Sequence, residues 1–279
     1  FYQSEFAGLA CAIKNCGIGN GLEEISETRL KIIAPDSIEL SHGWTEMGQG
    51  LNTIAMQILC EFLGLDDSIK IEIKCSTRAD AIGGMTTASR GTALLGNSII
   101  EAAQDLKKDL QDNSLSELVG REYYGRFMVD WTTTHDFDGK IISHFSYGYS
   151  AHLAILDENG CLKEIQAAHD GGKIINPALF EGQIQGGVVM GMGYAVKEKL
   201  PIKDGHLTSD RMSKRGLLKA KDIPEIKVIG IEDPDPIGPF GAKGVGEISC
   251  IPTAPAIANA YCKYDGERRY ELPLKPIKK

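Results

Sequence analysis

The sequence predicts an α+β fold with two lobes of mixed β-sheet, each covered by helices. Alternating apolar patterns typical of strands, and apolar spacings typical of helices, occur in both halves of the chain. Residues 111–140 lack this periodicity and carry polar clusters, as linkers do. We therefore expect a first α/β lobe at 1–114, a linker at 115–140 and a second α/β lobe at 141–279.

The first lobe is expected to contain both strands and helices. Its second strand segment is divided by the turn Pro35-Asp36-Ser37. Each helix follows a glycine-containing loop, and the longer one opens after Gly83–Gly91. In chain order the expected elements are strands at 6–16 and 27–40, a helix at 52–63, a strand at 70–75 and a helix ending near residue 110.

The second lobe should begin with a β-hairpin, because Asn159-Gly160 lies between two alternating apolar segments. Asn176-Pro177 then ends the extended chain and precedes a helix. In chain order we expect strands at 149–156 and 162–168, a helix at 178–200, a strand at 226–231 and a helix at 252–264.

The helix at 178–200 is rich in glycine, and each glycine in a helix interior costs up to about 1 kcal/mol relative to alanine. Two explanations remain open: close packing of the helix backbone against another element, or a ligand lying across the glycine face. The glycines are Gly182, Gly186, Gly187, Gly191 and Gly193.

Composition narrows the classes of function. The chain has 279 residues with a formal net charge of −8, which argues against a nucleic-acid partner. Its apolar runs are too short for a membrane span. The seven cysteines include no Cys-x-x-Cys pair, and none of the six histidines forms a His-x-x-x-His pair, so a metal held by protein ligands is disfavoured. We expect reduced thiols and a cytoplasmic location. Since the chain does not start with Met, we expect either a processed product or a part of a longer polypeptide.

Two loops precede expected helix N-termini, where free N–H groups attract anions. Gly48-Gln49-Gly50 presents an amide side chain between two glycines, which suits a heterocycle edge or an oxo ligand; a Gln49 that bonds only its own loop is the alternative. Thr86-Thr87-Ala88-Ser89-Arg90 combines hydroxyls with a guanidinium. Phosphate binding and plain helix capping explain that second loop equally well.

A third loop, Gly238–Glu247, places four glycines ahead of one carboxylate. A bare backbone of this kind suits a base aimed at a buried reacting centre, and a solvated surface turn is the alternative. Gln183, one turn into the glycine-rich helix, also stands beside a glycine.

Taken together, these motifs resemble the molybdenum hydroxylases of the xanthine dehydrogenase and aldehyde oxidase family, namely the C-terminal half of their molybdopterin-binding region. The resemblance covers nearly the whole chain, and the order of the motifs is more specific than any one of them. The motifs are Gly43–Gly50, Thr86–Arg90, Asn176-Pro177 with Gly182-Gln183, and Gly241–Glu247.

The resemblance implies roles for single residues. Gln49 and Gln183 would contact the pterin dithiolene, and Thr86, Ser89 and Arg90 would hold the phosphate or dinucleotide end. Glu247 would be the catalytic base beside molybdenum, which the dithiolene and no protein side chain holds. The cofactor-binding set is completed by Gly48, Gly50, Thr87, Ala88, Lys243 and Gly246. The cytosine dinucleotide form of molybdopterin is favoured.

The resemblance further implies hydroxylation of a purine-like heterocycle or an aldehyde. Partners would be the N-terminal half of the molybdenum region, iron–sulfur and FAD domains or subunits, and other copies in an oligomer. Two rivals stay open: a non-catalytic nucleotide-binding module, and a structural subunit whose glycine-rich helix packs against a partner.

Overall fold

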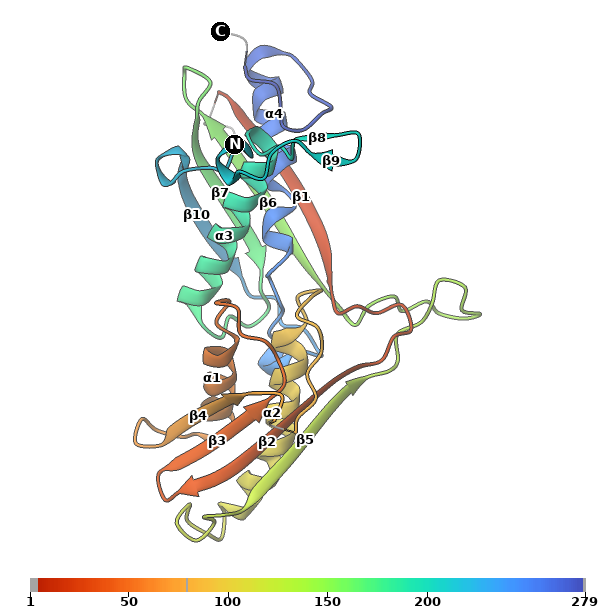
Figure 1. Cartoon of the computed structure of the whole chain (residues 1–279). Coiled ribbons are helices and arrows are strands. Elements are labelled where there is room, and N and C mark those ends of the chain that lie inside the picture. The colour runs from red at the N-terminus through yellow and green to blue at the C-terminus, as the bar shows by residue number, and fades with distance from the viewer. Residues whose placement is uncertain (1–4, 79, 278–279) are drawn as a thin grey trace.

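The computed structural model describes residues 5–78 and 80–277. It contains two four-stranded mixed sheets, each with helices packed on one face, as Figure 1 shows. The first lobe has the strand order β4-β3-β2-β5 and the second has β1-β6-β7-β10. The α+β class expected from the sequence is confirmed.

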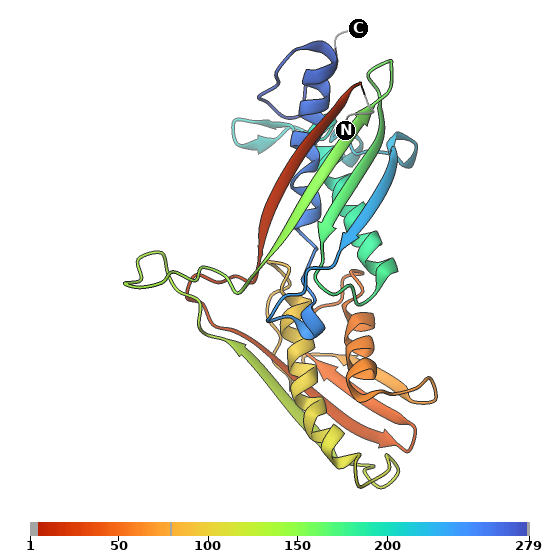
Figure 2. The same cartoon turned by 180° about the vertical axis from the view of Figure 1, so that it is seen from behind.

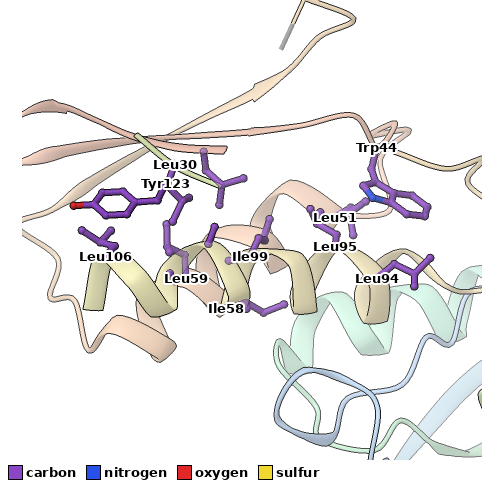
Figure 3. Close-up of a cluster of buried hydrophobic side chains, with 14 of the residues drawn as sticks. Leu30, Trp44, Leu51, Ile58, Leu59, Leu94, Leu95, Ile99, Leu106 and Tyr123 are labelled. Atoms are coloured by element: carbon purple, nitrogen blue, oxygen red, sulfur yellow. The ribbon is translucent and has the colours of Figure 1, made fainter. Parts of the chain in front are cut away.

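In the first lobe β2 pairs antiparallel with both β3 and β5, while β3 pairs parallel with β4. Leu30 and Ile32 of β2 are fully buried, whereas Lys31 between them points outward and pairs with Glu122. Helices α1 and α2 cover the inner face, where Figure 3 shows Leu59, Ile99 and other apolar side chains gathered. The elements are β2 (Glu24–Ala34), β3 (Ser37–His42), α1 (Leu51–Leu63), β4 (Lys70–Cys75), α2 (Gly91–Asp109) and β5 (Glu122–Val129).

In the second lobe β6 pairs antiparallel with β1 and β7, and β7 pairs parallel with β10. Helices α3 and α4 pack on each other and α4 lies against β1, so close that a Cβ at Gly8 would overlap the backbone of Ala260. Asn176 caps α3 by accepting the Leu179 N–H at 2.9 Å. The elements are β1 (Ala7–Cys16), β6 (Ser146–Leu156), β7 (Leu162–Asp170), α3 (Pro177–Val196), β10 (Glu225–Ile231) and α4 (Thr253–Asp265), with a small hairpin of β8 (Ile202–Lys203) and β9 (His206–Leu207).

Two expected boundaries differ from this arrangement. Sequence order predicts that β1 belongs to the first lobe, but Ala7 of this strand pairs with Ile155 in the second sheet. Strand β5 lies inside the expected linker at 115–140, and its buried Tyr123 and Val129 complete the first core. Pairing between segments far apart in sequence leaves no local signal, so periodicity alone cannot assign either strand to its sheet.

The chain therefore passes between the lobes more than once, as Figures 1 and 2 let the reader follow. The β1–β2 and β5–β6 connections lie side by side, since the Asn20 N–H donates to Ser143 O at 2.7 Å. After β10 the segment 232–252 reaches back to α2, where the Asn97 side chain donates to Ile237 O at 2.7 Å. Within the described residues no helix is both long and apolar enough to cross a membrane.

Candidate active site

A cavity of about 320 Å³ lies between the two lobes. The first turns of α1, α2 and α3 all reach its wall, so three positive helix ends converge on one space. The polar residues that line it are Gln49, Thr86, Thr87, Ser89, Arg90, Thr92, Lys173, Asn176, Gln183, Lys243 and Glu247.

Most residues expected at the site do meet here. Gly246 and eight of the polar residues that line the cavity belong to the site predicted from the sequence. Gly48, Gly50 and Ala88 were predicted with them but do not line the cavity. Ala88 nevertheless takes part through its backbone, as described next. Sequence reasoning missed Thr92 and Lys173 on the wall, and it missed Lys14, which contacts Glu247.

The Glu247 carboxylate is held at both oxygens. Its Oε1 accepts the Ala88 N–H at 2.9 Å, and its Oε2 lies 2.9 Å from Lys14 Nζ. The Glu247 N–H in turn donates to Ser89 Oγ at 3.1 Å. Because the side chain is still 42% exposed and lines the cavity, it is fixed in place but accessible to a ligand.

The loop that holds Glu247 is strained. Ala88 and Ser89 have φ values of 54° and 48°, a left-handed conformation that costs non-glycine residues about 1–3 kcal/mol each. Two contacts stabilise it: the Gly17 N–H donates to Ala88 O at 2.8 Å, and the bare backbone of Gly244 packs on Ser89 O. Strain of this kind, maintained by contacts from two other segments, is typical of functional sites.

Arg90 is committed to protein partners. Its side chain is 5% exposed, NH1 donates to buried Glu24 at 2.8 Å, and Nε and NH2 both donate to Met85 O. The guanidinium also lies 5.4 Å from the Trp44 ring. Three of its five donors are therefore used in fixing the loop before α2, which leaves less capacity for a phosphate than the sequence suggests.

Lys243 is likewise paired inside the protein. Its Nζ lies 2.6 Å from Asp170, with both side chains at most 7% exposed, and Asp170 also accepts the Gly172 N–H. This pair ties the Gly238–Glu247 loop to the end of β7. Lys243 thus acts in shaping the cavity wall.

The two glutamines differ. Gln49 accepts the Met47 N–H at 2.6 Å and donates to Thr45 O at 2.8 Å, so its amide is bonded within its own loop. Gln183 makes no side-chain hydrogen bond to the described part of the chain, and its amide lies near the bare Gly246 backbone. Of the two, Gln183 has the amide that is free to meet a ligand.

Glu46 caps the helix that follows Gln49. Burial opposes the charge on this carboxyl, but N–H groups of Asn52, Gly50 and Gly48 outweigh it and lower the pKa of Glu46. The N-terminus of α1 is therefore already bound by a carboxylate of the chain itself, that of Glu46. In the described part of the chain no side chain caps the N-terminus of α2, so its N–H groups at the cavity remain open to an external anion.

Comparison with known proteins fits this geometry. Residues 7–224 match the family model described as molybdopterin cofactor-binding domain. The chain belongs to this family. The resemblance to molybdenum hydroxylases inferred from the motifs is confirmed. Among the described residues, no group of three or more His, Cys, Asp or Glu side chains is arranged to hold a metal ion.

Relatives are found among oxidoreductases and their subunits. The chain is 28% identical over 293 residues to a probable xanthine dehydrogenase subunit of Bacillus subtilis, covering 93% of this chain and 39% of that protein. It is 27% identical over 281 residues to the aldehyde oxidoreductase of Megalodesulfovibrio gigas, covering 93% of this chain and 31% of that one. This molybdopterin cofactor-binding domain thus spans well under half the length of these relatives.

Solved structures share the fold. The crystal structure of the aldehyde oxidoreductase from Desulfovibrio desulfuricans matches with a TM-score of 0.79 at 24% identity, covering 94% of this chain and 30% of that one. The Cu,Mo-CO dehydrogenase matches with a TM-score of 0.75 at 22% identity, covering 93% and 38%. At these identities the likeness establishes the arrangement of both lobes.

Proposed function

We propose that the chain forms the C-terminal part of a molybdopterin-dependent hydroxylase of the xanthine dehydrogenase type. In this role it binds the molybdenum cofactor and supplies Glu247 as the base in hydroxylating a purine-like heterocycle or an aldehyde. One observation carries the proposal: a carboxylate held at both oxygens lines the same cavity as the uncapped N-terminus of α2.

The donors around the cavity suit a polar, phosphate-bearing cofactor. The uncapped start of α2, with Ser89 and Thr92, offers N–H and hydroxyl donors for a phosphate or for a cytosine dinucleotide. Gln183 offers an amide with both donors and an acceptor for the pterin end, beside the bare backbone of Gly246. A metal held by a dithiolene needs no ligand from the chain.

The bound group would supply the two-electron redox chemistry, as cofactors of this class do. The chain's own task is to orient this group and to accept a proton at a Glu247 oxygen. Since Ala88 and Lys14 each use one lone-pair direction of the carboxylate, others stay open toward the cavity. An oriented acceptor within reach of the substrate is what general-base catalysis requires.

Partner polypeptides are part of the proposal. The aligned region is 39% of one relative and 31% of the other, so the N-terminal half of the molybdenum region would be supplied by sequence outside this chain. Iron–sulfur and FAD domains or subunits would remove the electrons. Assembly into an oligomer and a cytoplasmic location remain predictions.

The structural-subunit rival is weakened by the packing of α3. A Cβ at Gly187 would overlap Ser249 of the same chain, so this glycine serves an internal contact. Gly191 likewise faces Cys250 and Thr253. Close packing within the chain explains these glycines without a partner helix.

The substitution Glu247→Gln in the complete enzyme tests the proposal. We expect turnover to fall by about a hundredfold or more, because an amide cannot accept the proton, while molybdenum content stays near that of the wild type. Glu225→Gln, at the exposed start of β10, is the control. If turnover survived in Glu247→Gln, Glu247 would not be the base. Affinity for cytidine nucleotides in a complex without molybdenum would favour the non-catalytic rival.

A further inference from the structure

Lys14 contacts Glu247 from an element that carries none of the cofactor motifs. It belongs to β1, and its Nζ lies 2.9 Å from Glu247 Oε2. Its side chain is 23% exposed, so this pair is better shielded than the surface pair of Lys31 with Glu122, where both side chains are about half exposed. The contact joins two segments that the sequence separates by most of its length.

The Lys14 ammonium is fully used in this position. Besides Glu247, it donates to Asn15 O at 3.1 Å and to Asn15 Oδ1 at 2.9 Å. An ammonium has three donors, so no further acceptor is needed. Asn15 is itself fixed because its amide donates to Gly17 O at 2.7 Å. The charge is therefore oriented by a local network that ends at the Glu247 carboxylate.

The arrangement leaves the cavity side of Glu247 free. Lys14 does not line the cavity, whereas Glu247 does. The second fixed donor, the Ala88 N–H, comes from the strained loop before α2. Two donors from separate segments thus restrict the carboxylate, and neither fills the space that a ligand would enter.

We propose that Lys14 is a positioning residue for Glu247, which holds the carboxylate against the Ala88 N–H. The inference rests on the proposed function, in which Glu247 is the base. Lys14 acts through Glu247 and needs no contact with cofactor or substrate.

Other charged and titratable groups surround this pair. Lys243 and Arg90 lie on the same wall, each with its own carboxylate partner. Cys250 in the following turn donates its thiol to Glu247 O at 3.2 Å. The pKa of His144 is lowered by burial and also by the charge of Lys14. Of these groups, Lys14 has the cationic atom that touches the carboxylate.

The first test uses this chain without cofactor. Hydrogen exchange of the Ala88 amide, followed by NMR, reports whether Glu247 stays on it. In Lys14→Met we expect exchange to become about two to five times faster, the range expected for losing a partly exposed ion pair. Lys14→Arg should restore the wild-type rate. Lys31→Met, which removes a strand lysine paired with Glu122, should leave Ala88 unchanged.

The second test uses the complete, molybdenum-loaded enzyme. Without Lys14 the carboxylate can leave the orientation in which it accepts a proton, which affects the chemical step and leaves substrate binding unchanged. We therefore expect kcat to fall about two- to fivefold in Lys14→Met while KM stays the same, and kcat to return in Lys14→Arg. Molybdenum content should be equal in all variants.

Unchanged Ala88 exchange together with an unchanged kcat in Lys14→Met would overturn the inference. Loss of molybdenum with unchanged Ala88 exchange would also overturn it, because Lys14 would then bind the cofactor directly. Failure of the proposed function has a different signature: Glu247→Gln would keep its turnover, whereas Ala88 exchange would still report on the contact of Lys14 with Glu247.

Discussion

Lowering the pH should destabilise the second lobe through two buried histidines. His152 and His169 are both fully buried, and their Nε2 atoms lie 2.7 Å apart, so one ring donates to the other. His152 Nδ1 lies 3.0 Å from Thr253 Oγ1. This bridge needs one ring to donate and the other to accept, so both rings cannot be protonated, because two N–H groups would then point at each other.

The pKa values of the two histidines show in which direction pH changes the stability. Burial, together with the charge of His169, lowers the pKa of His152 from 6.5 to about 3, and burial lowers the pKa of His169 from 6.5 to about 4. Below pH 6.5 these two histidines therefore bind protons in the unfolded chain but stay unprotonated in the folded chain. The contribution of the pair to the free energy of unfolding is fully present above pH 6.5, and it is lost as the pH falls toward the folded-state pKa values.

The magnitude follows from proton linkage. Between about pH 7.5 and about pH 5.5 each histidine lowers the free energy of unfolding by about 1.4 kcal/mol, hence by close to ~3 kcal/mol for the pair. The result depends little on the folded-state pKa values, since both lie far below this window. Burial also lowers the pKa of His42 and His144, so they add to the total slope.

Urea unfolding of the chain at these two pH values measures the effect. The double variant His152→Gln, His169→Gln isolates the pair, because it removes the pair's share of the pH dependence whatever its effect on stability at one pH. His206→Gln, on the exposed strand β9, is the matched control. If the double variant and the wild type lost the same stability between the two pH values, the assignment of a buried neutral pair would be refuted.

Two further pairs of substitutions test internal contacts of the chain, each pairing a buried site with an open or exposed control. Gly187→Ala should destabilise the chain by about 1–3 kcal/mol, because its Cβ would overlap Ser249. Gly186→Ala should be neutral or stabilise by up to about 1 kcal/mol, because no atom of the described residues lies within 4 Å of the added Cβ. Thermal unfolding compares the two variants, and equal effects would contradict the packing described. Glu24→Gln should lower the free energy of unfolding by about 3 kcal/mol, because it leaves the Arg90 charge buried without its partner. Glu122→Gln, which breaks a surface ion pair, should lower it by less than about 1 kcal/mol, and urea unfolding distinguishes the two.

Local pattern was sufficient for most elements of this fold. The apolar spacing of 52–63 and the hairpin at Asn159-Gly160 correspond closely to α1 and to the β6–β7 turn. The glycine-rich helix was also expected, although α3 ends at Val196, four residues before the expected end. Each of these signals depends on residues close together in sequence.

Contacts between distant segments could not be predicted in the same way. Nothing in 6–16 indicates that β1 joins the second sheet, because its partner β6 lies far along the chain. Arg90 has the residue type and position of a phosphate ligand, but its buried partner Glu24 lies 66 residues away. Lys14 is an ordinary strand lysine until folding brings it to Glu247. The composition of a loop indicates its chemistry, while tertiary contacts decide which groups are free.

The central claim is that the cavity between the lobes holds the pterin end of a molybdenum cofactor against Glu247. A crystal structure of the complete, cofactor-loaded enzyme tests it most directly. The account predicts pterin atoms within hydrogen-bond distance of the Gln183 amide, a phosphate at the start of α2, and the Glu247 carboxylate facing the metal. A cofactor bound elsewhere, with Gln183 and Glu247 both facing solvent, would contradict it.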